Sequence, residues 1–185
     1  MKSIILLLSV IILFSGCGCA SSEIDAAMEL RQRLLLGNCS FTAEITADYG
    51  DELYQFQMDC NTDTTGTMSF TVTEPASIAG ITGTINAEDA NLTFDKTVLS
   101  FPPLAGGRLS PVSSPWIFIN TLRSGYLSAC GKQADNLFIL ADDSYGDNAL
   151  HLEILTTTNT IPIQADIFWN QQQIITLNIR NFVIS

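Results

Sequence analysis

The chain has 185 residues, of which 19 are acidic and 8 basic, so its formal net charge at neutral pH is −11. An acidic surface repels phosphate groups, which makes nucleic acid a poor partner and argues against adhesion to anionic lipid through a basic patch. The length suits one domain with a sizeable core, and the abundance of Ile, Leu, Phe and Thr is typical of a chain rich in β-strands.

The N-terminal segment has the order of a secretory signal. Met1 and Lys2 give a positive start, residues 4–14 are apolar except for Ser9, and small residues follow. The apolar run is too short for a transmembrane helix, which needs about 20 apolar residues. We therefore expect residues 1–16 to be a signal peptide that directs the chain out of the cytoplasm.

The end of this segment resembles the lipobox of bacterial lipoproteins. In the stretch FSGC, residues 14–17, an apolar residue and two small ones precede Cys17, which in a lipobox is acylated on sulfur and becomes the first mature residue. Cys19 fits less well, because Gly16 stands where a large apolar residue is needed. Two acyl chains would give stable attachment where one is marginal. The alternative is an ordinary signal peptide cleaved near Ala20, which would release a soluble secreted protein.

After Cys17 we expect a tether through residue 22 and then a single domain, residues 23–185. The domain opens with a helix, since Ser22 can cap it, acidic residues lie at its positive end, basic residues lie toward its negative end, and Gly37 follows it. Its apolar residues fall largely on one face, which predicts packing on a sheet. These residues are Ile24, Ala27, Met28, Leu34 and Leu35.

From residue 39 the hydrophobic period changes from near 3.6 to 2, which is typical of β-strands. Alternation on both sides of a turn near Tyr49 and Gly50 predicts an antiparallel hairpin over residues 39–60. A third strand follows, with Met68, Phe70 and Val72 on one face. Three shorter strands are expected at residues 81–85, 91–94 and 98–101.

Residues 102–115 form an irregular stretch rich in proline and glycine. A second helix then starts with Ser114 as its cap and Pro115 at its first position, and it ends at Gly125. The C-terminal third returns to strands at residues 136–141, 150–155, 161–169 and 174–184. The expected fold class is α+β, mainly β, with a curved antiparallel sheet and two helices available for its concave side.

This order of elements resembles the LolA-like lipoproteins, the half-barrel group that includes the carriers LolA and LolB and related mycobacterial lipoproteins. The resemblance rests on the lipidated start, the two helices, and the stretches FTAEITADYGDELYQFQMDC, PPLAGGRLSP and IPIQADIFWNQQQIITLNIRNFVI. It implies an unclosed β-barrel whose concave face, roofed by helices, holds acyl chains or another hydrophobic ligand. The anchor distinguishes this chain from the soluble carrier of the group.

Within such a half-barrel, apolar residues of the strands and of the second helix are candidates to line the ligand cavity. The alternative for each of them is plain packing in the core. The candidates are Phe41, Ile45, Tyr54, Phe56, Met58, Phe70, Trp116 and Trp169.

No catalytic pattern accompanies the single histidine. His151 lies on the polar side of an expected strand, and neither a Gly-x-Ser-x-Gly stretch nor a Ser-x-x-Lys pair occurs, so we expect no enzymatic activity. The acidic run at residues 142–148 fits a hairpin turn better than a calcium loop, because Asp147 stands where that loop needs glycine. We expect no cofactor and no metal.

Cys39 and Cys60 fall on the apolar side of the first hairpin. A turn centred on Tyr49 and Gly50 would place them opposite each other, and outside the cytoplasm a disulfide is chemically allowed. Two buried thiols are an equal alternative, because one residue of register decides the geometry. Cys130 has no evident partner.

The sequence thus predicts a monomeric lipoprotein, held on the extracytoplasmic face of the cell membrane by a diacylglyceryl anchor. Its half-barrel would bind lipid or the acyl part of a lipoprotein. The alternative is a protein-interaction or envelope-sensing module that uses the same fold with no stored ligand.

Overall fold

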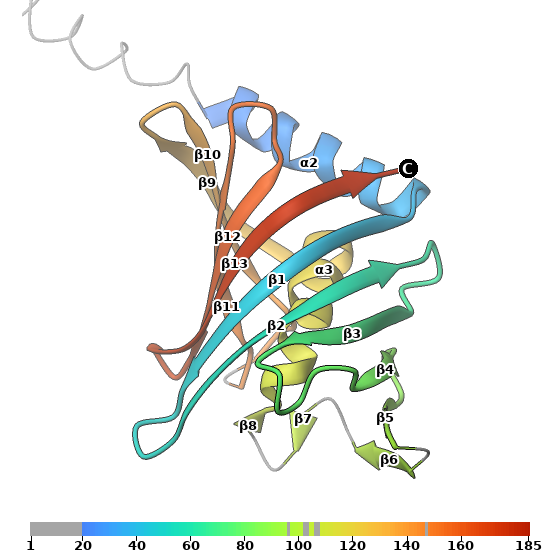
Figure 1. Cartoon of the computed structure of the whole chain (residues 1–185). Helices are drawn as coiled ribbons and strands as arrows, with labels where there is room; N and C mark the ends of the chain where they lie inside the picture. The colour runs from blue at the N-terminus through green and yellow to red at the C-terminus, as the bar shows by residue number, and fades with distance from the viewer. Residues whose placement is uncertain (1–19, 96, 102–103, 106–107, 147) are drawn as a thin grey trace, which may run out of the picture.

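A computed structural model describes residues 20–95, 97–101, 104–105, 108–146 and 148–185 (Figure 1). The expected signal peptide and Cys17 lie outside these ranges. The described helical elements are α2 (Ala20–Leu36), α3 (Ser114–Ser124) and the short 3₁₀ turn η2 (Pro111–Ser113). Neither α-helix in these ranges is long and apolar enough to cross a membrane.

The described strands fall on either side of α3 in the chain. Those before it are β1 (Cys39–Asp48), β2 (Leu53–Thr62), β3 (Met68–Glu74), β4 (Thr82–Ile85), β5 (Ala90–Phe94), β6 (Thr97–Phe101), β7 (Leu104–Ala105) and β8 (Arg108–Leu109). Those after it are β9 (Tyr126–Gln133), β10 (Asn136–Asp142), β11 (His151–Thr156), β12 (Pro162–Trp169) and β13 (Gln172–Ile184).

Eleven of these strands form one antiparallel sheet in the order β6-β5-β4-β3-β2-β1-β13-β12-β11-β10-β9. The first and last strands pair near its middle, with Ala43 opposite Ile179 and Ile45 opposite Leu177. The sheet is strongly curved, and its edges β6 and β9 do not pair with each other in the described part of the chain (Figure 1). The expected unclosed half-barrel is therefore confirmed.

Helix α3 fills the middle of the concave side (Figure 1). Nine of its eleven residues are buried, which is more than one face of a helix can bury against a single sheet. The ring of Phe118 meets that of Phe41 edge to face, with centroids 6.0 Å apart. The core thus consists of the inner face of the sheet wrapped around α3.

Backbone carbonyls hold α3 in this position. Trp116 Nε1 donates a hydrogen bond of 2.9 Å to the carbonyl of Gly66, and both Nη atoms of Arg123 donate to carbonyls of the β2–β3 turn. From the other side, Arg31 of α2 donates to the carbonyls of Leu122 and Gly125, each at 2.7 Å. A cation at the C-terminal end of a helix is also favoured by the helix dipole.

Helix α2 differs from expectation in its start and in its buried face. It begins at Ala20, so residues 20–22 belong to its first turn rather than to a tether, and Ser22 is not its cap. The residues it buries are Glu23, Ala27, Leu30 and Leu34. The predicted apolar face is therefore wrong in Ile24, Met28 and Leu35, each 47% exposed. The sequence carries two adjacent apolar stripes, and the contacts of α2 with β9 and α3 decide which one is covered.

Two further elements depart from the prediction. Strand β9 was not predicted; its residues are mostly exposed, and among the described strands it pairs only with β10. Helix α3 begins one residue earlier than predicted, at Ser114, with Ser113 in the cap position, and Gly125 follows its end as expected. The stretch expected to be irregular contains the short pairing of β7 with β8 and the turn η2.

Candidate functional site

An apolar pocket of about 470 Å³ lies between the sheet and the chain segment that leads into α3. Ligand pockets in proteins commonly measure about 300–1,000 Å³ and have mostly apolar walls with a few polar groups, which describes this one. Its walls consist of Tyr49, Glu52, Tyr54, Phe56, Val72, Ile78, Ile81, Leu92, Leu109, Ser110, Pro111 and Val112.

The pocket exists because α3 covers only part of the concave face. On β2, Met58 is completely buried, Phe56 is partly exposed and Tyr54 is 43% exposed. These residues alternate along one face of the strand, so exposure rises along that face toward the β1–β2 turn. The inner face that α3 leaves uncovered forms the floor of the pocket.

The connection between β3 and β4 forms a second wall. The amide of Val72 donates to the carbonyl of Ile81 at 2.8 Å, and the amide of Gly80 donates back to the carbonyl of Val72 at 2.9 Å. Gly80 has a φ of +90°, a conformation that side chains larger than hydrogen disfavour. These bonds fix the loop against β3, and its residues Ile78 and Ile81 line the pocket.

Residues 109–112 form the roof of the pocket. Tyr49 ties this roof to the sheet, because its hydroxyl donates a hydrogen bond to the carbonyl of Leu109. The rings of Tyr49 and Tyr54 meet edge to face at 6.3 Å, and the hydroxyl of Tyr54 donates to a carboxylate oxygen of Glu52 at 2.6 Å. The pocket thus combines an apolar interior with a small polar group, which suits an apolar chain that carries a polar end.

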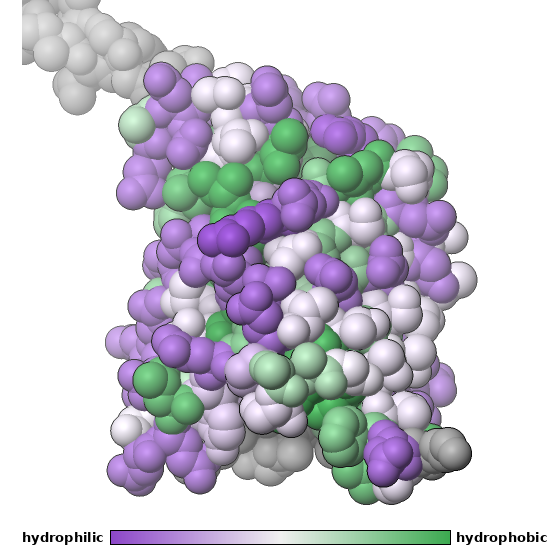
Figure 2. Space-filling model, viewed as in Figure 1, coloured by the Kyte–Doolittle hydropathy of each residue, from purple (hydrophilic) through white to green (hydrophobic). Residues whose placement is uncertain are grey.

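Apolar surface continues from the pocket onto β5 and β6. Leu92 lines the pocket and pairs with Leu99 of β6, which is 61% exposed. Phe94 lies two residues beyond Leu92 on the same face of β5 and is 52% exposed. Hydrophobic surface is visible at the lower end of the molecule, where Figure 1 places β5 and β6 (Figure 2). Exposed apolar side chains therefore extend from the pocket onto the β5–β6 hairpin.

The eight residues predicted to line a cavity fall into three groups: pocket wall, partly buried and core. Tyr54 and Phe56 lie in the wall of the pocket. Trp169 is half-buried against the core and is not among the lining residues. The other five are buried in the core, each at most 7% exposed: Phe41, Ile45, Met58, Phe70 and Trp116.

Most of the pocket lining was not singled out from the sequence. Ile78 and Ile81 lie in a loop, and Val112 lies in the turn before α3. The sequence did carry one signal for them, namely bulky aliphatic residues inside turn-rich segments. Such residues need apolar surroundings that a loop alone does not supply, so they indicate that the loop packs against the rest of the domain. Arg31 and Arg123, which hold α3, had no comparable signal in the sequence.

Cys39 and Cys60 are free thiols in the structure. Cys39 pairs with Thr62, and Cys60 pairs with Phe41, so the expected direct opposition of the two cysteines is wrong. The β1–β2 turn is centred one residue later than expected, and this moves the thiols to diagonal positions. Burial raises the pKa of the Cys60 thiol well above its usual value and raises the pKa of Cys39 as well. Both thiols are therefore poor nucleophiles.

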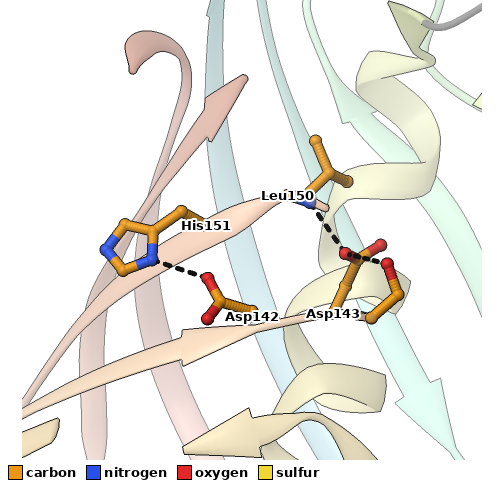
Figure 3. Close-up of polar contacts among 5 residues, drawn as sticks. Asp142, Asp143, Leu150 and His151 are labelled. Carbon is orange, nitrogen blue, oxygen red and sulfur yellow. Dashed lines mark hydrogen bonds and ion pairs between the residues drawn. The ribbon is translucent and has the colours of Figure 1, made fainter. Parts of the chain in front are cut away.

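At the end of β10, Asp142 and Asp143 contact residues at the start of β11 (Figure 3). Nδ1 of His151 lies 2.8 Å from a carboxylate oxygen of Asp142 on the neighbouring strand, and both side chains are partly exposed. Asp143 accepts hydrogen bonds from the amide of Leu150 and the hydroxyl of Ser144, at 2.7 and 3.0 Å. These contacts give the carboxylates a structural role in the β10–β11 connection.

Neither a protein-family model nor a curated protein sequence matches the chain. Solved structures of similar fold include a LolA superfamily protein from Nitrosomonas europaea, with 11% identity, coverage of 91% of this chain and 94% of that one, and a TM-score of 0.49. Another is a putative outer membrane lipoprotein-sorting protein domain from Vibrio parahaemolyticus, with 10% identity, coverage of 87% and 91%, and a TM-score of 0.48. The Mycobacterium tuberculosis lipoprotein LppX matches with 9% identity, coverage of 87% and 93%, and a TM-score of 0.43. Each of these three alignments spans most of both chains at 9–11% sequence identity.

Proposed function

We propose that this protein is an extracytoplasmic lipoprotein that binds the apolar chain of a lipid, or of an acylated protein, in the pocket roofed by residues 109–112. The single observation that supports the proposal most strongly is the pocket itself. A folded domain gains stability by covering apolar surface, and here mostly aliphatic and aromatic side chains line a pocket of about 470 Å³. An apolar ligand would cover that surface.

A paired substitution on the β5–β6 hairpin tests ligand binding. Leu92→Glu places a charge in the pocket wall, whereas Val98→Glu places the same charge on an exposed residue of β6 that pairs with Thr93 outside the pocket lining. We expect Leu92→Glu to weaken binding of a fluorescent acyl-chain probe by about tenfold or more, because an unpaired carboxylate in an apolar site is costly. Equal binding by both variants and the unsubstituted protein would contradict the pocket assignment.

The anchor is proposed from the sequence around Cys17 and is tested by intact mass. Protein isolated from bacterial membranes should begin at Cys17 and carry the added mass of a diacylglyceryl group. Cys17→Ser should abolish that added mass, while Cys19→Ser should leave it in place. If the chain proves to be cleaved near Ala20 with no added mass, the protein is a soluble secreted one.

A protein-interaction or envelope-sensing role is the second candidate function. It is favoured by the way α3 fills the concave side, which leaves five of the residues predicted to line a cavity inside the core. Mass spectrometry of the purified protein separates the two functions. Extractable lipid supports the ligand-binding role, whereas a bare polypeptide that takes up no added lipid supports the interaction role.

A further inference from the structure

Helix α2 exposes a row of large apolar side chains. Ile24, Met28 and Leu35 are each 47% exposed. At 3.6 residues per turn, these three positions lie within about 40° of one another around the helix axis. We refer to Ile24, Met28 and Leu35 as the α2 stripe; it lies beside the buried face of the helix, and hydrophobic surface is visible over α2 at the upper end of the molecule (Figure 2).

One charged residue, Arg31, lies beside the stripe, about 20° from Ile24 around the helix axis. Its Nε donates to the carbonyl of Leu122 and its Nη2 to the carbonyl of Gly125, each at 2.7 Å. The guanidinium is therefore engaged with the C-terminal end of α3. The side chains that the α2 stripe presents to solvent are all apolar.

The stripe begins close to the proposed anchor. Ala20, the first residue of α2, is three residues after Cys17, and three extended residues span at most about 11 Å. Ile24 lies one turn into the helix, about 6 Å farther along its axis. A diacylated Cys17 would therefore hold the first turns of α2 beside the bilayer.

We propose that α2 lies along the bilayer to which Cys17 is attached, with the α2 stripe inserted at the lipid interface. This proposal rests on the anchor in the proposed function. The stripe runs from Ile24 to Leu35, about 17 Å along the helix, so it can be covered at once only if the helix axis is parallel to the membrane. Apolar side chains are the contact that fits, because a chain of net charge −11 is not drawn to a membrane by basic residues.

Tryptophan substitutions in the complete mature lipoprotein test this orientation. Met28→Trp and Leu35→Trp sample two positions of the α2 stripe, and Val98→Trp, at a residue that is 62% exposed on β6, is the matched control. Each protein is reconstituted in phosphatidylcholine vesicles with and without brominated acyl chains, which quench nearby tryptophan. The unsubstituted protein gives the signal of the native Trp116 and Trp169.

We expect bromination to lower the fluorescence of the introduced tryptophan about twofold or more in both stripe variants and to leave that of Val98→Trp unchanged.

Quenching of Met28→Trp alone would overturn the flat orientation, since an upright helix brings only its first turns to the membrane. Quenching of neither variant, in protein that floats with the vesicles, would overturn the membrane contact while leaving the anchor intact. Protein that fails to float would overturn the anchor and the proposed orientation together, and acyl-probe binding to the pocket would still be tested separately.

Discussion

Gly83 shows how one small residue shapes the wall of the half-barrel. A Cβ atom at this position would lie 2.3 Å from the carbonyl oxygen of Asn91 and 2.5 Å from the ring of Phe70. Both distances are far below van der Waals contact, so a side chain at this position would force its neighbours to move. The missing side chain lets the ring of Phe70 pack against the backbone of the neighbouring strand.

The first prediction follows from this contact. Gly83→Ala should lower the free energy of unfolding by about 1–3 kcal/mol, because the added methyl group forces the strand or the Phe70 ring to move. Gly131→Ala is the control, since a Cβ there meets nothing within 4 Å. The control should change stability by less than about 0.5 kcal/mol. Urea unfolding checks both, and equal stability of the two variants would show that β4 can shift freely.

The cysteines provide a second prediction at the scale of single residues. Cys60 is 1% exposed and Cys39 4% exposed, whereas Cys130 is only partly buried on the edge strand β9. Iodoacetamide reacts with thiolates, so it should label Cys130 in the folded protein and label Cys39 and Cys60 only after denaturation. Peptide mass spectrometry reads out the labelling. A disulfide-linked peptide containing Cys39 and Cys60 would contradict the free thiols.

At the scale of elements, Arg31 connects the two helices of the described chain. Its guanidinium donates to carbonyls at the C-terminal end of α3, a segment that otherwise has few donors for its last carbonyl groups. Arg33, two residues later on α2, is exposed and lies on another side of the helix. Arg31 therefore connects α2 to α3, whereas Arg33 is exposed to solvent.

The third prediction compares these two arginines. Arg31→Ala should lower the free energy of unfolding by about 1.5–3 kcal/mol, since hydrogen bonds from a charged donor to α3 are lost. Arg33→Ala should cost less than about 0.5 kcal/mol. Thermal and urea unfolding measure both changes. If Arg33→Ala costs as much as Arg31→Ala, the contact with α3 does not hold the helices together.

The elements that the sequence predicted well are those with a strong alternation of apolar and polar residues. Strand β1 buries every second residue from Cys39 to Ala47, and this pattern was visible in the sequence. Strand β9 was not predicted because an edge strand need not bury one side and so need not alternate. Its least exposed residues, Leu127, Cys130 and Gly131, are only partly buried. The buried face of α2 was predicted wrongly for a different reason. The helix carries two apolar stripes side by side, and only tertiary packing decides which of them is buried.

At the scale of the whole molecule, the chain order explains why the barrel stays open. Strands before α3 build one half of the sheet and strands after it build the other, and β1 pairs with β13 where the halves meet. The segment between the two outer edges, β6 and β9, contains α3 and enters the concave side (Figure 1). A helix in that position occupies space that a closed barrel of this kind would fill with strand side chains.

The curved sheet with helices on its concave side could be predicted from alternation and from the order of elements. The location of the pocket could not, because it depends on how far α3 extends over the sheet. Where α3 covers the strands, aromatic residues such as Phe41 are core, and where it does not, residues such as Phe56 line a pocket. The limit between the covered and the uncovered part of the sheet lies at the turn of residues 109–113. The position of this turn depends on tertiary packing, which the local sequence pattern does not reveal.

An apolar chain bound in the pocket roofed by residues 109–112 would contact the side chains that line it. Photolabelling tests this contact: a fatty acid that carries a diazirine near the end of its chain is bound to the mature protein and irradiated, and the modified residues are located by peptide mass spectrometry. We predict modification of pocket residues such as Phe56, Ile81, Leu92 and Val112. Modification confined to residues outside the pocket, or saturable binding with no modified pocket residue, would contradict the claim.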